Sequence, residues 1–478
     1  MVSEPAAPSV VTLRPLYVDL DGTLVKSDTL VDSLLVLLRT RPALLMKLPG
    51  RLIAGKAAFK AFVSNSISLD VARLPYNRKL LQFLQQERGR GREIYLATGA
   101  NEQTGRRVAA HLGIFSGVLG SNGATNLTGN NKLDRIGSGE FDYIGNASAD
   151  LPLLAHATEP MMANPSLGLR LRLRARGIHP KREFVERSHP LKSLLHAVRL
   201  HQWAKNLLIF VPLLLSHAVN SARLLTGLLA FICFSLTASA TYIVNDLLDI
   251  EADRRHPRKR LRPFASGDLP AFAGVCIVAF FLLLALSGAR LLPHAFYGWL
   301  LLYLASTLAY SSYLKRIALV DVLVLSGMYT LRLLAGGAST HTHISHWLAG
   351  FSIFLFLSLA FVKRFAELEN LRTSGLRPAN GRGYLVADSQ QLRTFGTTSA
   401  FAAVVVFANY ISGRDVVTLY REPKLLWLMM PLMILWLCRV WLLASRGELN
   451  EDPVIFAITD KMSLLIGLAV VVIAFLAM

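Results

Sequence analysis

Long apolar runs dominate the chain beyond about residue 195, whereas residues 1–190 carry shorter apolar runs broken by polar positions. A helix of about 20 apolar residues crosses the hydrocarbon core of a bilayer. Nine runs come close to that length, at residues 196–218, 222–244, 270–290, 292–312, 318–338, 346–364, 395–413, 424–445 and 462–478. The pattern predicts a multi-pass, all-α membrane domain of about nine transmembrane helices, preceded by a soluble α/β domain.

We expect three regions along the chain. Residues 1–165 form the α/β domain with a helical cap around residues 25–90, residues 166–192 form a basic linker next to the membrane, and residues 193–478 form the membrane domain. The cap mixes apolar and basic residues, which suits either a membrane surface or packing on its own domain. Arginines alternate with leucines in the linker, and they suit anionic headgroups.

Basic residues outnumber acidic ones, with a net charge of +20. A nucleic-acid partner is one explanation of such an excess. The positive-inside rule explains it better, because the basic residues gather in the loops at 245–269, 313–317 and 363–394. We therefore expect a bacterial-type inner-membrane protein in contact with membrane lipids and without a nucleic-acid partner, and an oligomer is possible. Its N-terminal domain and active sites face the cytoplasm and its C-terminus lies outside.

An acidic and then basic segment follows the second apolar run. Asn245, Asp249 and Asp253 are four residues apart, so on a helix they share one face with Asp246 nearby. Clustered carboxylates repel one another unless a cation lies among them, and Mg²⁺ prefers such oxygen ligands. Basic side chains that can hold phosphates follow at Lys259, Arg260 and Arg262. The segment predicts a magnesium–diphosphate site at the membrane surface.

The N-terminal region begins with a short apolar strand that ends in Asp19-Leu-Asp21-Gly-Thr. Carboxylates at the end of a strand can hold Mg²⁺, and one of them can attack phosphorus. This segment resembles the first motif of the haloacid dehalogenase-type (HAD) phosphotransferases. Three later segments resemble the other motifs of that family, at Ile94–Gly99, around Lys132, and at Phe141–Asp150.

The HAD resemblance implies a role for each matching residue. Asp19 would be the nucleophile and Asp21 the general acid/base, while Thr98 would bond the phosphoryl group and Lys132 would neutralise its charge. The metal ligands would be Asp19, Asp21, Asn146 and Asp150. The fourth motif usually begins Gly-Asp, and this chain has Gly145-Asn146 instead. The site thereby loses one negative charge, so the domain is either a phosphatase or an inactive binding or regulatory module.

The apolar runs and the segment at 245–253 together resemble the UbiA superfamily of intramembrane prenyltransferases, which have nine helices. A subgroup, the decaprenyl-phosphate phosphoribosyltransferases, is more similar. The residues that carry this resemblance lie at Gln202–Asn206, His256–Gly267, Ala309–Lys315 and Val362–Leu368. The resemblance implies two substrates, phosphoribosyl diphosphate (PRPP) and a polyprenyl phosphate. It also implies Mg²⁺ held by Asn245, Asp249 and Asp253, of which Asp249 and Asp253 are catalytic.

Aromatic prenyltransferases carry a second Asp-rich motif after the fourth span, but here one acid, Asp321, stands near Lys315 and Arg316. Fewer acids and more bases suit a second phosphorylated substrate better than a neutral acceptor. Arg332 lies inside a span, where a buried guanidinium needs an anionic partner. Lys363 and Arg364 either bind phosphate or anchor a helix end. The candidate substrate-binding residues are Lys205, Tyr242, Asp246, Lys259, Arg260, Arg262, Tyr310, Lys315, Asp321, Arg332, Lys363 and Arg364.

The leading hypothesis is a bifunctional enzyme with one Mg²⁺ in each domain. The membrane domain would transfer 5-phosphoribosyl from PRPP to polyprenyl phosphate, and the HAD-like domain would remove the 5-phosphate. The alternative is an aromatic prenyltransferase with a 4-hydroxybenzoate-like acceptor and a regulatory or inactive HAD-like domain.

Overall fold

The computed structural model describes residues 13–123, 125–374, 383–449 and 452–478. Part of the basic loop expected at 363–394 therefore lies outside the described residues. The chain groups into two compact units, Met1–Val198 with Tyr242–Ile277 and Arg199–Thr241 with Val278–Met478. Two long helices, α11 (Ser221–Leu248) and α13 (Ala271–Ala289), contribute residues to both units.

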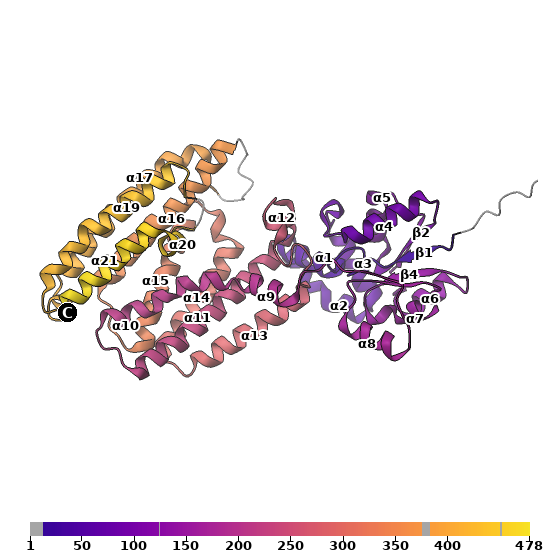
Figure 1. Ribbon diagram of the computed structural model, residues 1–478, viewed down its shortest axis with the longest axis horizontal. Coiled ribbons are helices and arrows are strands. Elements are labelled where there is room, and N and C mark those ends of the chain that lie inside the picture. Colours follow the sequence, from indigo (N-terminus) through magenta and orange to yellow (C-terminus); the bar gives the residue numbers. More distant parts are fainter. Residues whose placement is uncertain (1–12, 124, 375–382, 450–451) are drawn as a thin grey trace, which may run out of the picture. The chain divides into compact units, whose positions relative to one another are not determined.

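A six-stranded sheet forms the centre of the first unit (Figure 1). Its strands are β1 (Leu16–Val18), β2 (Ile94–Asn101), β3 (Gly117–Ser121), β4 (Asp142–Gly145), β5 (Pro160–Ala163) and β6 (Arg182–Phe184). They are paired in parallel in the order β3-β2-β1-β4-β5-β6. This confirms the α/β prediction. Because the order runs outward from β1 on both sides, it reverses between β1 and β4, where open α/β sheets bind ligands.

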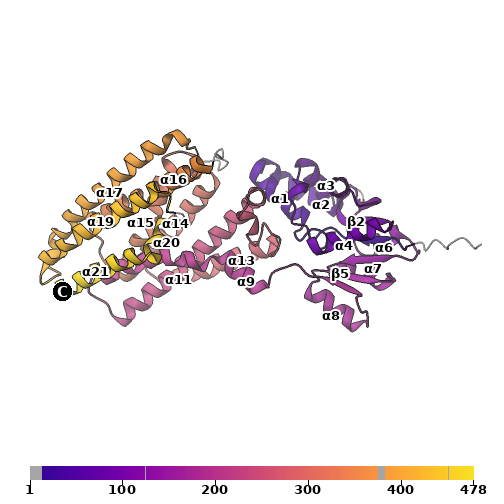
Figure 2. The same cartoon turned by 45° about the horizontal axis from the view of Figure 1, so that its top comes forward.

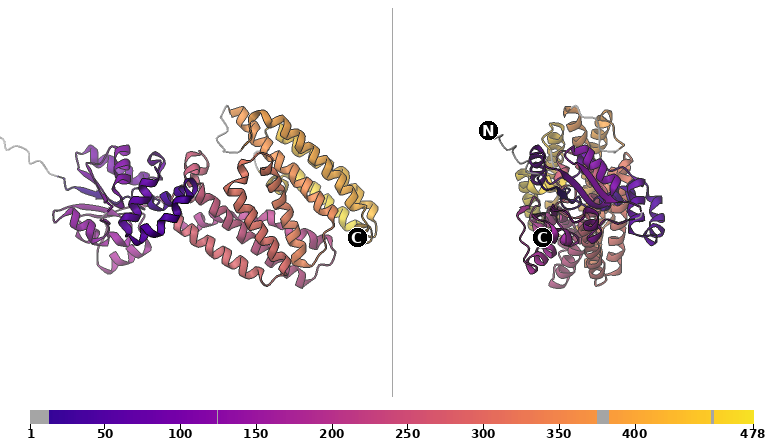
Figure 3. Two further views of the ribbon diagram at one scale, coloured as in Figure 1. Left: turned by 180° about the vertical axis from the view of Figure 1, so that it is seen from behind. Right: turned by 90° about the vertical axis from the view of Figure 1, so that its right-hand side faces the viewer.

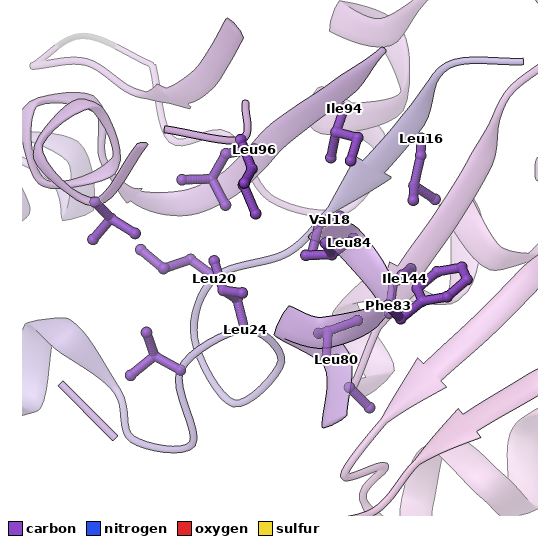
Figure 4. Close-up of a cluster of buried hydrophobic side chains, with 14 of the residues drawn as sticks. Leu16, Val18, Leu20, Leu24, Leu80, Phe83, Leu84, Ile94, Leu96 and Ile144 are labelled. Atoms are coloured by element: carbon purple, nitrogen blue, oxygen red, sulfur yellow. The ribbon is translucent and has the colours of Figure 1, made fainter. Parts of the chain in front are cut away.

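The period of two along β1 gives the sheet two apolar faces. Leu16 and Val18 join a buried cluster with residues of β2, β4, α4 (Arg78–Gly89) and α5 (Glu102–Leu112), which Figure 4 shows in close-up. Tyr17 packs on the other face, against a cluster built largely from short helices. These helices are α6 (Asn130–Ile136), α7 (Leu151–His156) and α8 (Leu167–Ala175).

The expected helical segment between the first two motifs is present. It contains α1 (Thr29–Thr40), α2 (Leu48–Ile53) and α3 (Lys56–Ser66) ahead of α4. The Asp28 side chain caps α1 by accepting hydrogen bonds from the amides of Leu30 and Val31.

Residues 166–192, expected as a linker, contain α8, the edge strand β6 and the start of α9 (Pro190–Val198). The alternating leucines lie on the helix α8. Two of them, Leu169 and Leu173, are four residues apart, so they share one face of this helix and pack on the same cluster. The strand β6 completes the sheet beside β5.

The regular elements of the second unit, in the part of the chain that the structure describes, are helices (Figure 2). Its elements are a 3₁₀ segment (Leu200–Phe210), α10 (Val211–Leu215), α14 (His294–Ser312), α15 (Val320–Thr340), α16 (His346–Ser374), α17 (Ser389–Ile411), α18 (Arg414–Val417), α19 (Met429–Ser445), α20 (Pro453–Thr459) and α21 (Lys461–Ala477), together with parts of α11 and α13. Helices α15, α16, α17 and α19 share a buried apolar core, and their long axes can also be followed from behind in Figure 3. On α21, Leu464, Leu468, Val471 and Phe475 form an exposed stripe, as expected of a face in contact with lipid.

Nine spans are not confirmed. Within the described residues six helices are long and apolar enough to cross a membrane, or up to seven if α20 and α21, bent by 76°, form one span. The run at 196–218 is broken, because Arg199 adopts a left-handed backbone conformation and a 3₁₀ segment and Pro212 follow. The run at 292–312 forms α14, whose polar residues lower its mean hydropathy.

Candidate active sites

Two buried carboxylates share one lysine at the carboxyl edge of the sheet. Asp19 follows β1 and Asp150 lies shortly after β4, so both are where the strand order reverses. Lys132 Nζ lies 2.9 Å from Asp19 Oδ1 and 3.6 Å from Asp150 Oδ1. The structure thus brings together residues that the sequence separates by 113 positions, as the four predicted motifs require.

Tyr143 connects the lysine to the second carboxylate, and it lies in the fourth motif segment without having been assigned a role there. Lys132 Nζ lies 3.0 Å from the Tyr143 hydroxyl, which donates to Asp150 Oδ1 at 2.8 Å. The other oxygen of Asp150 accepts hydrogen bonds from the amides of Asn146 and Ala147, each at 3.1 Å. The place of Tyr143 on a strand next to β1 was the one sequence signal for its role.

Asn146 lies against the turn of the first motif. Gly22 has φ +77°, and a Cβ there would lie 2.0 Å from Asn146 Nδ2, so this turn requires glycine on both counts. Thr23 donates from its hydroxyl to Asp19 Oδ2 at 3.3 Å. The residue that departs from the HAD pattern is therefore placed beside the two motif aspartates.

Burial shifts the acids of this site. It raises the pKa of Asp19 to about 6, with Lys132 opposing the shift. Burial and then the charge of Asp28 raise the pKa of Asp21 well above its usual value. Burial would lower the pKa of Lys132, but Asp19 and Asp150 outweigh it and raise that pKa. Asp21 is thus suited to carry a proton, while Lys132 stays charged beside Asp19 and Asp150.

Two more polar side chains lie in this region, Thr98 on the strand β2 beside β1 and Lys60 on the helix α3. Thr98 is fully buried on β2, and its hydroxyl oxygen accepts a hydrogen bond from the Ala100 amide. Lys60 of α3 donates to the Gly99 carbonyl at 2.7 Å and to Asn126 Oδ1 at 2.8 Å. This cap lysine therefore packs on its own domain, at Gly99 of β2, which follows Thr98.

The Asp-rich segment keeps its helical spacing across a break. Helix α11 ends at Leu248 and α12 (Ile250–Arg255) follows Asp249. The Asp249 amide donates to the Asn245 carbonyl at 2.9 Å, and the Asp253 amide donates to the Asp249 carbonyl at 2.8 Å. The four-residue spacing therefore places all three predicted metal ligands along one side of the backbone, as expected.

Arginines pair with the carboxylates of this segment. The Arg262 guanidinium donates to Asp246 Oδ1 at 2.9 Å and to Asp253 Oδ2 at 2.8 Å. Arg39 of α1 lies 3.1 Å from Asp249 Oδ1. Burial raises the pKa of Asp253, although Arg262 opposes the shift. The sequence did not predict that Arg262 pairs with the acids, because its pattern assigned Arg262 to a substrate phosphate.

The other predicted residues of the segment are more exposed. Lys259 and Arg260 are exposed side chains, and Tyr242 is half-buried on α11, three residues before Asn245. Among the residues that the structure describes, no three His, Cys, Asp or Glu side chains are grouped as a metal site. The donor chemistry of both predicted sites nevertheless consists of carboxylate and amide oxygens, which fits Mg²⁺.

In the second unit, two lysines converge on one carboxylate that the sequence did not single out. Asp452 Oδ2 accepts hydrogen bonds from Lys205 Nζ at 2.7 Å and from Lys363 Nζ at 2.8 Å. Lys205 also lies over the ring of Tyr329. Two positive charges therefore share one negative charge, and the cluster keeps an excess positive charge.

A second cluster contains Asp321, the single acid expected there. The Arg364 guanidinium pairs with both oxygens of Asp321 and donates to the Tyr310 hydroxyl at 3.0 Å and to Glu367 Oε2 at 2.7 Å. Tyr310 in turn donates to Asp321 Oδ1 at 2.7 Å. Asp321 and Arg364 are 0% and 2% exposed, so this ion pair is buried, whereas the Glu367 side chain is 33% exposed.

The expected anionic partner of Arg332 is not found among the described residues. Its guanidinium donates to Asn206 Oδ1, to the Met328 carbonyl and to the Tyr303 hydroxyl, at 2.6–3.0 Å. It also lies 4.8 Å from the centre of the Tyr303 ring. Neutral oxygens and an aromatic face therefore compensate this buried cation, whereas the sequence predicted an anionic partner.

Lys315, another predicted substrate-binding residue, lies in the turn after α14.

Comparison with known proteins gives a family match for more than half of the chain. Residues 207–475 match the UbiA prenyltransferase family. An uncharacterised protein of Sinorhizobium fredii is 37% identical over 95% of this chain and 89% of its own length. The decaprenyl-phosphate phosphoribosyltransferase of Mycobacterium tuberculosis is 34% identical over 46% of this chain and 74% of its own length.

Among solved structures, a UbiA homologue from Archaeoglobus fulgidus bound to GPP and Mg²⁺ aligns with a TM-score of 0.46. The two sequences are 18% identical, and the alignment covers 59% of this chain and 99% of the Archaeoglobus homologue.

Proposed function

The chain belongs to the UbiA prenyltransferase family, and on that premise we propose that it is a phosphoribosyltransferase of the membrane. It transfers 5-phosphoribosyl from PRPP to a polyprenyl phosphate and releases diphosphate. The N-terminal domain then removes the 5-phosphate, which leaves polyprenyl-phosphoryl ribose. The relatives named decaprenyl-phosphate phosphoribosyltransferase support the first step.

One observation carries the choice of acceptor. Lys205 and Lys363 lie together on Asp452, and the excess positive charge of this cluster suits a phosphorylated substrate. Asp321, the acid that would belong to a second metal motif, instead forms an ion pair with Arg364. A neutral aromatic acceptor would not need the paired lysines.

The transfer replaces one bond at ribose C1 by another. The bond from C1 to the diphosphate oxygen breaks, and an oxygen of the lipid phosphate forms the new bond from the opposite face. That phosphate is already ionised at neutral pH, so it needs positioning more than a general base. Lys205 and Lys363 provide that positioning, and Lys259, Arg260 and Arg262 balance the charge of the departing diphosphate.

The hydrolysis step uses the carboxyl edge of the N-terminal sheet. The Asp19 carboxylate attacks the phosphorus of the 5-phosphate, and Asp21 gives its proton to the departing ribose oxygen. Lys132 offsets the charge that builds up on the phosphoryl group. Water then hydrolyses the aspartyl-phosphate, and phosphate is released.

Two sets of oxygen donors would hold Mg²⁺. Asn245, Asp249 and Asp253 would hold one ion and Asp19, Asp21, Asn146 and Asp150 another, and the bound ions would neutralise phosphate charge. We further propose that both sites face the cytoplasm, where PRPP is found, on the basis of the basic loops.

Labelled PRPP and polyprenyl phosphate, given to the full chain in membrane vesicles with Mg²⁺, test the proposal. The wild-type protein is expected to yield a lipid that carries ribose without a 5-phosphate. Asp19→Asn is expected to yield the same lipid with its 5-phosphate, because transfer is intact and hydrolysis is lost. Chelation of divalent cations is expected to abolish both products.

Two other results would contradict the proposal. A product formed from prenyl diphosphate and an aromatic acid, with PRPP ignored, identifies an aromatic prenyltransferase. A lipid that keeps its 5-phosphate with wild-type protein, unchanged by Asp19→Asn, leaves the N-terminal domain without the hydrolytic role.

A further inference from the structure

Arg254 follows the predicted metal ligand Asp253 in the sequence and pairs with an acid of the N-terminal domain. It belongs to α12, and its side chain is 8% exposed. Its guanidinium contacts three different places in the first unit. The Nε donates to the Ala265 carbonyl at 3.1 Å, one NH donates to Asp32 Oδ2 at 2.8 Å, and the other donates to Ser27 Oγ at 3.1 Å.

Asp32 is the matching buried acid on the N-terminal side. It lies on α1, is 1% exposed, and accepts a second hydrogen bond from the Ser27 hydroxyl at 2.7 Å. Its other oxygen, Oδ1, is buried without a hydrogen-bond partner. Because breaking a buried ion pair leaves an uncompensated charge, the loss of either Arg254 or Asp32 is expected to disturb both segments.

Further contacts join the same two segments. Lys26 Nζ lies 3.4 Å from Asp268 Oδ1, and Arg39 pairs with Asp249. Gly267 has φ +73°, and a Cβ there would lie 2.7 Å from the Cβ of Lys26. Residues 249–268 therefore pack directly on residues 26–39.

Residues 26–32 also support the hydrolytic site. The Thr29 amide donates to Asp21 Oδ1 at 2.8 Å, and the Gly22 amide donates to the Ser27 carbonyl at 3.2 Å. One short stretch of chain thus holds the Asp21 turn on one side and Arg254 on the other.

From these contacts we propose that Arg254 is a positioning residue of the transfer site. Anchored on Asp32 and Ser27, it sets the place of Asp253 and hence of the segment that binds the diphosphate of PRPP. The N-terminal domain is then a structural part of the transferase as well as a hydrolase. This inference rests on the proposed function for its substrate, but its geometric basis lies within the first unit.

Kinetics of the full-length protein in vesicles test this role. Arg254→Met and Asp32→Asn are expected to raise the KM for PRPP roughly 10-fold to 100-fold, because small displacements of a binding group carry such costs. The KM for polyprenyl phosphate is expected to stay within about twofold, and the double variant is expected to be no worse than either single one. General damage to the fold would instead lower the amount of active enzyme and leave both KM values unchanged.

Arg255→Met is the matched control. Arg255 is the next residue, its side chain is more than half exposed, and it pairs with Asp70 at 3.6 Å and Glu251 at 3.5 Å. Its loss is expected to leave the KM for PRPP within about twofold of wild type, since exposed pairs contribute little. A wild-type KM for PRPP in Arg254→Met, or an equal rise in Arg255→Met, would overturn the proposal.

Hydrogen exchange separates failure of this inference from failure of the proposed function. Mg²⁺ with inorganic diphosphate is expected to slow amide exchange over residues 249–262 in the wild type and in Arg255→Met, but not in Arg254→Met or Asp32→Asn. This pattern supports the positioning role even if PRPP is not the donor. Equal protection in all four proteins, or protection in none, rejects it.

Discussion

Lys363 and Arg364 are neighbours in the sequence, yet they belong to clusters of opposite character. Arg364 pairs with two acids, Asp321 and Glu367, and donates a hydrogen bond to the Tyr310 hydroxyl. Lys363 shares Asp452 with Lys205, so cations outnumber the acid. Adjacent residues on a helix point about 100° apart and meet different neighbours. Lys363 and Arg364 lie within α16 and not at its end, and the comparison teaches that a basic pair inside a helix can divide between an acid-rich and a lysine-rich cluster.

Removal of the buried arginine is expected to have the largest effect. Arg364→Met leaves Asp321 buried without its partner, which costs about 3–5 kcal/mol in the free energy of unfolding. Thermal unfolding of the purified protein in detergent measures this loss. The double variant Asp321→Asn with Arg364→Met is expected to recover most of it. Wild-type stability of the single variant would show that the network does not hold the helices together.

Arg332 offers an intermediate case, because it is a buried cation with neutral partners. Arg332→Met is expected to lower the free energy of unfolding by about 1–3 kcal/mol, since Asn206 and Tyr303 lose hydrogen bonds. The KM values for both substrates are expected to stay within about twofold. A large rise in either KM with unchanged stability would instead make Arg332 a ligand of the substrate phosphates.

The two lysines are expected to affect binding more than stability. Lys205→Met or Lys363→Met leaves Asp452 paired with the remaining lysine, so the fold is kept. The KM for polyprenyl phosphate is expected to rise about tenfold in either variant, as for a lost charge-assisted hydrogen bond. Steady-state transfer with varied lipid phosphate measures this. A wild-type KM in both variants would remove the cluster from the acceptor site.

The smallest effect is expected at Arg372, eight residues beyond Arg364 on α16. It is exposed and pairs with Glu369 three residues away. Arg372→Met is expected to change the free energy of unfolding by less than about 0.5 kcal/mol, because surface pairs contribute little. The same unfolding experiment serves as the control for Arg364→Met, and comparable losses in the two variants would erase the distinction between buried and exposed pairs.

The meeting of Asp19 and Asp150 could be predicted because each follows a strand of the sheet. Parallel strands place their carboxyl ends at one edge, so Asp19 and Asp150 had to meet once the sheet formed. Lys132 lies on α6, and its role was implied by the HAD resemblance and not by a strand end. Tyr143 and Lys60 were not predicted: Tyr143 lies in the fourth motif segment but was assigned no role there, and Lys60 lies on α3, outside the motifs.

In the membrane region the sequence predicted where helices occur better than how many spans they make. Apolar run length identified α11, α13, α15, α16, α17 and α19. It did not detect the break after Arg199, because a run of apolar residues does not reveal a backbone turn. It also counted α14 as a span, although the polar residues of this helix lower its mean hydropathy. The sidedness of the membrane domain stays a prediction.

The sequence by itself determined the apolar runs, the α/β pattern ahead of them and the residue types that suit phosphate chemistry. These follow from local period and composition, which are properties of consecutive residues. Only the tertiary structure decided which charges are paired: Arg254 with Asp32, Arg364 with Asp321, and two lysines with Asp452, which lies 247 positions from Lys205. Charge balance depends on which long side chains meet across helices and loops. A local sequence pattern does not predict these partners, because they lie far apart in the chain.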